Sequence, residues 1–396
     1  MNRVLVTDGH FRKTLAVVRS LGRKGVEVAV GERTYLNTSF FSKYCSSRLI
    51  YPSPRRYPDR FIEFLLAEIK KYPTDCLFPM EEETLLLVAK YRSEISKHTY
   101  LLIPDLEKIE FVRDKGNLIR FAEAHGIPVP KTLYSPPTQT SVSSRTDLPH
   151  EGGGEKEGYV IKPRISSGSF GIVYVKKKED LVSSYQRVHQ RYPFPLVQEY
   201  IPDGGGTFGF SALFDESSNI KAAFVHKKLR MYPVQGGPST LREGVIHPHI
   251  MELGLSLLKA LNWVGIAMVE FKVDPRDGIP KLMEINPRFW GSLQLAIFSG
   301  VDFPYLILKM AKGEQFEPVL QYPIGRRSRW LLFGDILHFV DNPRRFRLHP
   351  SFFRFFDQET CDDMISKDDP LPVLGAMATF FTFLYDPEMK QFLERR

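Results

Sequence analysis

Apolar and polar positions divide the N-terminal part of the chain into alternating strands and helices. Three short apolar runs have the length and composition of buried strands, at residues 3–8, 26–32 and 75–80. Three longer segments repeat apolar side chains every three or four positions, as amphipathic helices do, at residues 11–25, 60–72 and 82–95. Alternation of this kind predicts a parallel sheet with helices on both faces. Residues 1–112 are therefore expected to form a Rossmann-like α/β domain.

The rest of the chain predicts a mixed α+β region. Strand-like runs lie at residues 159–163, 172–177, 195–201, 207–215 and 221–233. Helical repeats lie at residues 114–126, 179–192 and 248–262. Residues 135–158 are rich in Ser, Thr, Pro and Gly and are expected to form a surface loop. The expected units are residues 113–200, residues 201–320 and a mainly helical C-terminal appendage at residues 321–396.

One predicted hairpin gathers polar side chains on one face. Its two strands, residues 267–273 and 279–285, alternate apolar and polar positions around a turn-forming segment. Because strand side chains repeat every two residues, Glu284 and Asn286 share a face, and the turn brings Glu270 opposite them. Two carboxylates and an amide oxygen suit Mg²⁺. A hairpin whose polar face only meets water would show the same short motif.

Upstream of the hairpin, a lysine and a loop of small residues form a second polar feature. Lys162 ends a strand-like run and precedes the sequence RISSGSFG at residues 164–171. Small residues let backbone N–H groups approach phosphate oxygens and the lysine adds charge, although a plain hairpin turn would also fit. The loop is not a P-loop, because the chain contains no G-x-x-x-x-G-K-[ST]. Arg288, just beyond the hairpin, would add a cation to the same site.

Composition narrows the partners and the compartment. The net charge of +8 and the pI of about 9.2 fit an anionic nucleotide with an anionic substrate, and no nucleic-acid-binding motif is recognised. No apolar run could span a bilayer, and the first residues resemble a strand rather than a signal peptide. Together with three scattered cysteines, these features predict a cytoplasmic protein. Arg and Phe interleave at residues 344–356, which predicts contact with a membrane surface or an acidic partner, or else a solvated helix over an aromatic core.

Six landmarks follow one another along the chain: DKGNLIRFAEAHGIPVPKT, YVIKP, SSGSFG, LVQEYIPDGG, VEF and LMEINPR. This ordered set resembles the ATP-grasp superfamily, and it is most similar to the carbamoyl-phosphate-synthase-like carboxylate–amine ligases. The resemblance covers roughly residues 1–310. It implies an ATP-grasp fold in which a pre-ATP-grasp domain precedes a small subdomain (113–200) and a large subdomain (201–320) that grip ATP between them.

The resemblance implies roles for individual residues. The cations that would contact the phosphates are Lys115, Lys162 and Arg288, of which Lys162 and Arg288 would also act in catalysis. The loop that would close over the phosphates contains Ser167, Gly168 and Ser169. The residues that would bind the adenosine are Glu199, Tyr200, Ile201, Asp203 and Met283, where strict alternation turns Met283 to the face opposite Glu284. The oxygen ligands of Mg²⁺, for which Mn²⁺ is an alternative, would be Glu270, Glu284 and Asn286.

The acceptor side of the site is predicted from placement alone. Residues 226–244 differ from what is expected in biotin carboxylase or carbamoyl-phosphate synthase. Their polar side chains are expected to face the acceptor, with Arg230 acting in catalysis; they are Lys228, Arg230, Ser239, Thr240 and Arg242. Sheets of this kind bind ligands at the carboxyl ends of their strands, where the polar residues are Thr7, Asp8, Glu32 and the acids at 81–83. Those three acids could equally complement a helix dipole.

The resemblance implies an ADP-forming reaction. A substrate carboxylate would attack the γ-phosphoryl group of ATP, and an amine would convert the resulting acyl phosphate into an amide. The alternatives are a carboxylate–thiol ligase, an acyl-phosphate-forming kinase, a non-catalytic ATP-binding protein and a membrane-associated scaffold. The acid and the amine would be small molecules of unassigned identity, and a homodimer is left open.

Overall fold

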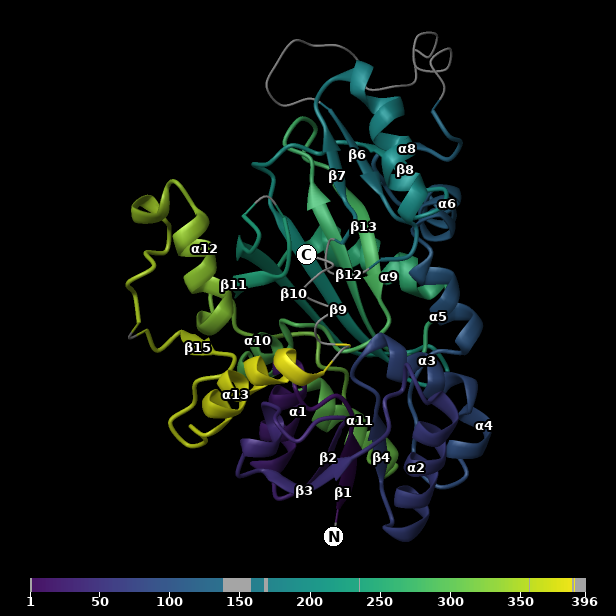
Figure 1. Ribbon diagram of the computed structural model, residues 1–396, viewed down its shortest axis with the longest axis vertical. Coiled ribbons are helices and arrows are strands. Elements are labelled where there is room, and N and C mark those ends of the chain that lie inside the picture. The colour runs from purple at the N-terminus through teal and green to yellow at the C-terminus, as the bar shows by residue number, and fades with distance from the viewer. Residues whose placement is uncertain are drawn as a thin grey trace.

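Three β-sheets organise the chain (Figure 1). The computed structural model describes residues 2–137, 158–166, 170–234, 236–355, 357–386 and 388. Within these ranges, no helix is long and apolar enough to cross a membrane.

The N-terminal sheet is parallel, as predicted, with the strand order β3-β2-β1-β4. Its strands are β1 (Arg3–Val6), β2 (Glu27–Glu32), β3 (Cys45–Ile50) and β4 (Cys76–Phe78). Its helices are α1 (Arg12–Gly22), the 3₁₀ helix η1 (Ser39–Phe41), α2 (Pro58–Lys71), α3 (Glu82–Lys90) and α4 (Arg92–Ile95). Because side chains alternate along a strand, Val4 and Val6 pack into the core with α1, and Leu5 packs into the core with α2.

The small second sheet is antiparallel, with the order β5-β8-β6-β7. Its strands are β5 (Thr132–Leu133), β6 (Tyr159–Lys162), β7 (Val173–Val175) and β8 (Leu196–Glu199). The helices of this part of the chain are α5 (Leu106–Arg113), α6 (Lys115–Ala124), η2 (Lys178–Asp180) and α8 (Leu181–Arg191). Leu181, Tyr185 and Val188 of α8 form one face at helical spacing and bury themselves against this sheet.

The large sheet has the order β13-β12-β9-β10-β11-β14-β15. Its first five strands in sequence are β9 (Thr207–Phe214), β10 (Ile220–Met231), β11 (Ser239–Gly244), β12 (Gly265–Val273) and β13 (Pro280–Asn286). The helices beside it are α9 (Pro248–Ala260), α10 (Leu293–Phe298) and α11 (Phe303–Ala311). Phe210 and Phe214 pack with α9, whereas Leu213 and Phe224 enter the core shared with α1 and the N-terminal sheet. This shared core includes Phe289 and so holds the segment that follows β13 against the N-terminal domain.

The C-terminal residues combine several helical segments with two short strands. Strands β14 (Arg327–Arg329) and β15 (Thr360–Asp362) extend the large sheet beyond β11. The helical parts are a tight turn at Leu331–Asp335, α12 (Ile336–Asp341), η4 (Arg345–Arg347) and α13 (Pro372–Tyr385). A buried ion pair of 2.9 Å between Arg19 and Asp369 ties this region to α1. The predicted unit boundaries stay predictions, but the large sheet crosses the last of them.

Candidate active site

The predicted hairpin forms from β12 and β13. Glu270 pairs directly with Glu284, and Met268 pairs with Asn286. The Glu270 side chain is 18% exposed and the Glu284 side chain 31% exposed, so both carboxylates are reachable from solvent. Asn286 donates a hydrogen bond of 3.2 Å from Nδ2 to Glu284 Oε1, which leaves the amide oxygen of Asn286 as its acceptor atom. The structure therefore brings the two carboxylates and the amide together, and their role as metal ligands stays a prediction.

A β-bulge alters the position of Met283. Phe271 pairs with Leu282 while Glu270 pairs with Glu284, so Met283 is the extra residue on β13. Leu282 is fully buried, whereas Met283 places its Sδ 3.8 Å from Lys162 Nζ. The prediction that Met283 faces away from the site of Glu284 is therefore wrong, because a bulge interrupts the alternation along the strand.

A lysine reaches each hairpin carboxylate. Lys228 Nζ lies 2.6 Å from Glu270, and Lys115 Nζ lies 3.6 Å from Glu284. Lys115 also donates a hydrogen bond of 2.7 Å to the carbonyl oxygen of Ser166, at the start of the SSGSFG segment. Lys228, predicted on the acceptor side, thus lies beside the hairpin carboxylate Glu270.

The local sequence explains how Lys115 comes to lie beside Lys162. Asp114 caps α6 by accepting hydrogen bonds from the backbone N–H groups of Gly116 and Asn117 at 2.8 and 3.2 Å. The same carboxylate pairs with Arg164 at 2.8 Å, and Arg164 follows β6, the strand that ends at Lys162. One cap therefore fixes the start of the helix that carries Lys115 to the end of the strand that carries Lys162.

The charges of this cluster perturb one another. Burial and, after it, the positive charge of Lys115 lower the pKa of Lys162 to about 8, against the opposing effect of the Glu284 and Glu270 carboxylates. Burial would raise the pKa of Glu284, but Lys115, the hydrogen bond from Asn286 and two further cations outweigh it and keep that pKa below its ordinary value. Glu284 is thus an ionised carboxylate over the physiological pH range.

The oxygen donors of the hairpin fit Mg²⁺. Glu270, Glu284 and Asn286 offer hard oxygen atoms on one face, the ligand type that Mg²⁺ prefers. The described residues contain no group of three or more His, Cys, Asp or Glu side chains that could hold a metal. A metal ion at the hairpin would therefore take its remaining ligands from water or phosphate, as Mg²⁺ commonly does.

The predicted adenosine residues gather around β8 and the hairpin turn. The buried Glu199 carboxylate pairs with Arg276 at 2.9 Å and with Lys281 at 3.2 Å. Asp203 pairs with Lys272 at 2.8 Å, and the same lysine lies over the Tyr200 ring. Ile201 is buried. If adenine contacts the Glu199 carboxylate, it shares that carboxylate with Arg276 and Lys281. Three loop residues, Ser167, Gly168 and Ser169, lie outside the described residues.

Several residues that were predicted to face the acceptor substrate form contacts within the protein instead. Arg230 is 3% exposed and bonds to Asp335 and to the carbonyl oxygen of Pro350. Arg242 is fully buried and pairs with Asp363, while Thr240 bonds to Asp335 at 3.0 Å. Ser239 is buried as well and bonds only to backbone oxygens. Arg230 is therefore engaged by the C-terminal region rather than turned towards an acceptor, because that region covers this part of β10 and β11.

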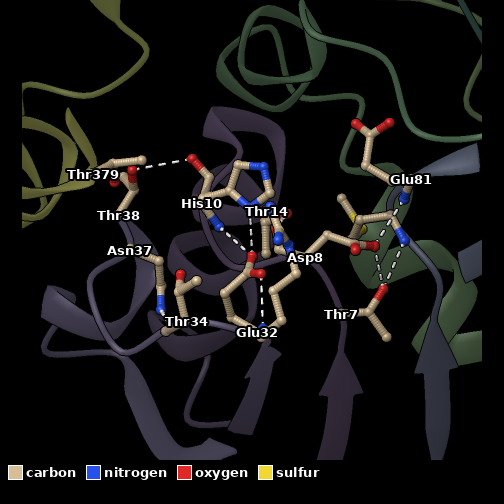
Figure 2. A network of polar contacts seen from close by, with 12 residues as sticks. Thr7, Asp8, His10, Thr14, Glu32, Thr34, Asn37, Thr38, Glu81 and Thr379 are labelled. Carbon is tan, nitrogen blue, oxygen red and sulfur yellow. Dashed lines mark hydrogen bonds and ion pairs between the residues drawn. The ribbon is translucent and has the colours of Figure 1, made fainter. Parts of the chain in front are cut away.

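A second polar cluster lies at the carboxyl ends of the N-terminal strands (Figure 2). Asp8 follows β1, accepts hydrogen bonds from the hydroxyls of Thr7 and Thr84 at 2.6 and 2.7 Å, and adopts a positive φ of 60°. His10 Nδ1 lies 2.5 Å from Glu32 Oε2, at the end of β2. Because a carboxylate only accepts, Nδ1 carries the proton in this pair, and Nε2 of the partly exposed ring is left as the acceptor.

Burial and charge set the protonation of this N-terminal cluster. Burial raises the pKa of Asp8, and the neighbouring charge of Glu32 adds to the effect. Burial opposes a charged His10, but Glu32 and Asp8 outweigh burial and Arg33, so the pKa of His10 is raised above its ordinary value. The cluster therefore contains a histidine whose carboxylate neighbours favour its charged form.

Glu81 connects the N-terminal cluster to the hairpin. It lies at the start of α3 and pairs with Lys13 at 2.7 Å, and its other oxygen is 3.9 Å from Nε of Arg288. The positive charges of Lys13, Arg288 and His10 lower the pKa of Glu81 to about 2, against the effect of burial. Lys13 also donates a hydrogen bond of 3.0 Å to the carbonyl oxygen of Phe289. Arg288 thus lies between the two clusters.

Comparison with known proteins adds an independent line of evidence. A family model described as ATP-grasp in the biosynthetic pathway with Ter operon matches residues 225–329. A D-alanine–D-alanine ligase from Pelotomaculum thermopropionicum is 24% identical over 170 residues, which are 39% of this chain and 52% of that protein. The match thus spans about half the length of that curated relative.

Solved structures resemble the whole arrangement. The biotin carboxylase domain of 2-oxoglutarate carboxylase from Hydrogenobacter thermophilus, in complex with MgADP, ADP and bicarbonate, matches with a TM-score of 0.64 and 15% identity, over 82% of this chain and 73% of that one. An L-amino acid ligase from Bacillus licheniformis matches with a TM-score of 0.57 and 16% identity, over 78% and 74%. The chain therefore has the ATP-grasp fold, and the resemblance to the ATP-grasp superfamily that its sequence predicts is confirmed.

Proposed function

We propose that this protein is an ATP- and Mg²⁺-dependent ligase that joins a small-molecule carboxylate to an amine and releases ADP and phosphate. One observation carries the proposal: Glu270 and Glu284 face each other on the hairpin, and a lysine reaches each of them. Such a balanced set of carboxylates and cations suits a site where a divalent ion binds the carboxylates and phosphate oxygens bind the cations.

The hairpin, together with Lys115 and Lys162, would hold the phosphates. Glu270, Glu284 and Asn286 would be the ligands of Mg²⁺, which when bound offsets the charge of the phosphate oxygens. Lys115 and Lys162 would bind the same phosphates and orient the terminal group. A pKa of about 8 leaves Lys162 mostly protonated at neutral pH, and a bound polyanion would favour its charged form further.

Arg288 is the cation best placed to stabilise the transferred phosphoryl group. Its Nε is buried, lies 3.9 Å from Glu81 and has no hydrogen-bond partner among the described residues, so an anionic ligand would displace no hydrogen bond from it. In the proposed reaction a carboxylate oxygen bonds to the γ-phosphorus, the bridging bond to ADP breaks, and an acyl phosphate forms. The contribution of the protein to this step is positioning and charge stabilisation.

The N-terminal cluster would serve the amine. The nitrogen attacks the acyl carbon, phosphate leaves, and the amine must lose a proton. His10 could accept that proton on Nε2 because Glu32 holds the opposite nitrogen as the donor and stabilises the charged ring. Glu81, between Lys13 and Arg288, links this base to the phosphoryl side of the site.

The names of the relatives support the class of reaction. A D-alanine–D-alanine ligase and an L-amino acid ligase share sequence or fold with this chain, which favours amino acids as the first candidate substrates. The Hydrogenobacter structure is described as a dimer with MgADP. For this chain, a homodimer and a cytoplasmic location remain proposals.

The test is a screen for ADP release. Pairs of amino acids and small acids are incubated with the protein, ATP and Mg²⁺, and the products are identified by mass. The proposal requires ADP to form in step with a product that is one water lighter than the sum of two substrates. ADP formation that no acid stimulates, or an acyl phosphate that accumulates without any amide, would contradict it.

A further inference from the structure

Five phenylalanines, one in α12 and four after it, form one cluster. The Phe339 ring lies 4.2 Å from Phe352 and 5.6 Å from both Phe346 and Phe353, and Phe355 lies 5.7 Å from Phe352. Figure 1 shows α12 at the left margin of the molecule, apart from the β12–β13 hairpin in its middle. These residues therefore take no part in the site described above.

Most of these rings are exposed. Phe346 is 78% exposed, Phe353 58% and Phe355 50%, and the neighbouring Val340 is 62% exposed. The alternative of a solvated helix over an aromatic core is therefore wrong: α12 ends at Asp341, and three of the rings that follow it face solvent. Contiguous exposed apolar surface of this kind usually marks an interaction site.

The same surface is basic. Residues 336–355 contain four arginines, at 344, 345, 347 and 354, and a single acidic residue, Asp341. Arg354 pairs with Asp357 at 3.1 Å, but within the described residues Arg344, Arg345 and Arg347 form no ion pair. Residues 336–355 are named the Phe–Arg surface below.

We propose that the Phe–Arg surface docks the protein onto an anionic lipid membrane. Aromatic side chains partition to the boundary between headgroups and acyl chains, and arginines beside them pair with lipid phosphates. Acidic side chains on a partner protein would pair with the arginines but would leave the exposed rings without an apolar surface to cover them. A second copy of the chain would place its four arginines against the four arginines of the first copy, and these like charges repel. A negatively charged, deformable bilayer surface satisfies the rings and the charges together.

The chain supplies a matched control. Leu371, Leu374, Met377 and Phe381 are each more than half exposed and recur at helical spacing along α13. This stripe is as apolar as the Phe–Arg surface, but Pro372–Tyr385 contains no charged residue, and Asp368 and Asp369 precede it. Apolar exposure alone would act through either surface, whereas the proposal requires the basic one.

The experiment is flotation of the full chain with vesicles. We expect the protein to float with vesicles of phosphatidylcholine and about 30% phosphatidylglycerol at about 50 mM salt, and to bind much less with pure phosphatidylcholine or at high salt. Phe346→Glu with Phe353→Glu should weaken binding at least about tenfold. Removing the three unpaired arginines should weaken binding by up to about a hundredfold, since each basic residue near an anionic surface contributes roughly fivefold.

The outcomes distinguish a membrane from a second copy of the chain as the partner of the Phe–Arg surface. Leu374→Glu with Met377→Glu should leave vesicle binding unchanged, and all variants should keep the parental melting temperature. Failure of the parent chain to float with anionic vesicles would overturn the proposal, as would equal loss in the α13 variant. If the parent chain does not float but self-associates, and Phe346→Glu abolishes this self-association in sedimentation, the surface is a contact between copies instead.

Discussion

The hairpin cluster and the N-terminal cluster lie on opposite sides of Arg288, and they balance their charges differently. On the hairpin, each carboxylate faces a lysine, and the pKa of Glu284 is lowered. At the ends of the N-terminal strands, Glu32 faces a histidine, and burial raises the pKa of Asp8 against the hydroxyl hydrogen bonds that it accepts. The first cluster combines an ionised carboxylate with lysines that are charged at neutral pH, as phosphate binding needs. The second contains a histidine that can exchange a proton and whose pKa is raised, as an amine nucleophile needs.

The largest effect is expected on the hairpin. Glu284→Gln keeps the shape of the side chain but removes a charge that the metal would need. We expect ADP release to fall on the order of 10³-fold while ATP still binds, which calorimetry can measure. Glu243→Gln is the control, because Glu243 pairs with Arg327 elsewhere on the same sheet. Near-parental turnover of the Glu284 variant would show that the hairpin is not the metal site.

His10→Asn tests the proposed role of the N-terminal cluster. Loss of a general base should reduce amide formation on the order of 10²-fold and leave ATP affinity unchanged. Because the pKa of His10 is raised, the activity of the parent should rise with pH through a midpoint above the ordinary histidine value of about 6.5. Glu32→Gln removes the main charge that raises this pKa, so the midpoint should move to lower pH. His98→Asn, beside Glu94 on the surface, is the control. A profile that keeps its acidic limb in His10→Asn would exclude the histidine as the base.

Lys162→Ala should weaken ATP binding by about 1.5–3 kcal/mol, the range for a charge-assisted contact. Lys115→Ala should act in the same direction. Lys176→Ala removes an exposed lysine just after β7 and should have no effect. Unchanged nucleotide affinity in both Lys162→Ala and Lys115→Ala would show that these lysines do not bind the phosphates.

The smallest effect is on the pH dependence of ATP binding. The pKa of Lys162 is lowered to about 8 in the free protein, so its charge is lost as pH rises through that value. ATP affinity should therefore be constant below about pH 7.5 and should fall by up to about tenfold per pH unit above 8, in calorimetric titrations. Lys162→Arg keeps its charge at these pH values and should flatten the decline. An equal decline in the arginine variant would assign the titration to another group.

The hairpin could be predicted because its information is local. Glu270, Glu284 and Asn286 lie within 17 residues of one another, and strand alternation places them on one face. The same rule failed for Met283, since a bulge is set by pairing with the neighbouring strand rather than by the sequence of β13 alone.

The N-terminal pair and the C-terminal strands could not be predicted in the same way. His10 and Glu32 are separated by 22 residues, and only the parallel pairing of β1 with β2 brings them together. Arg242 was expected to face the acceptor, but the pairing of β14 with β11 and of β15 with β14 buries it against Asp363. Long-range ion pairs of this kind leave no periodic signal in the sequence.

The most direct test of the ligase mechanism follows an oxygen atom. With ¹⁸O in the carboxylate of an acid identified by the ADP screen, attack on the γ-phosphoryl group leaves one labelled oxygen between carbon and phosphorus. Attack by the amine then expels that oxygen with phosphate. We predict labelled inorganic phosphate in step with amide and ADP. Release of AMP and pyrophosphate, with the label in AMP, would contradict the mechanism.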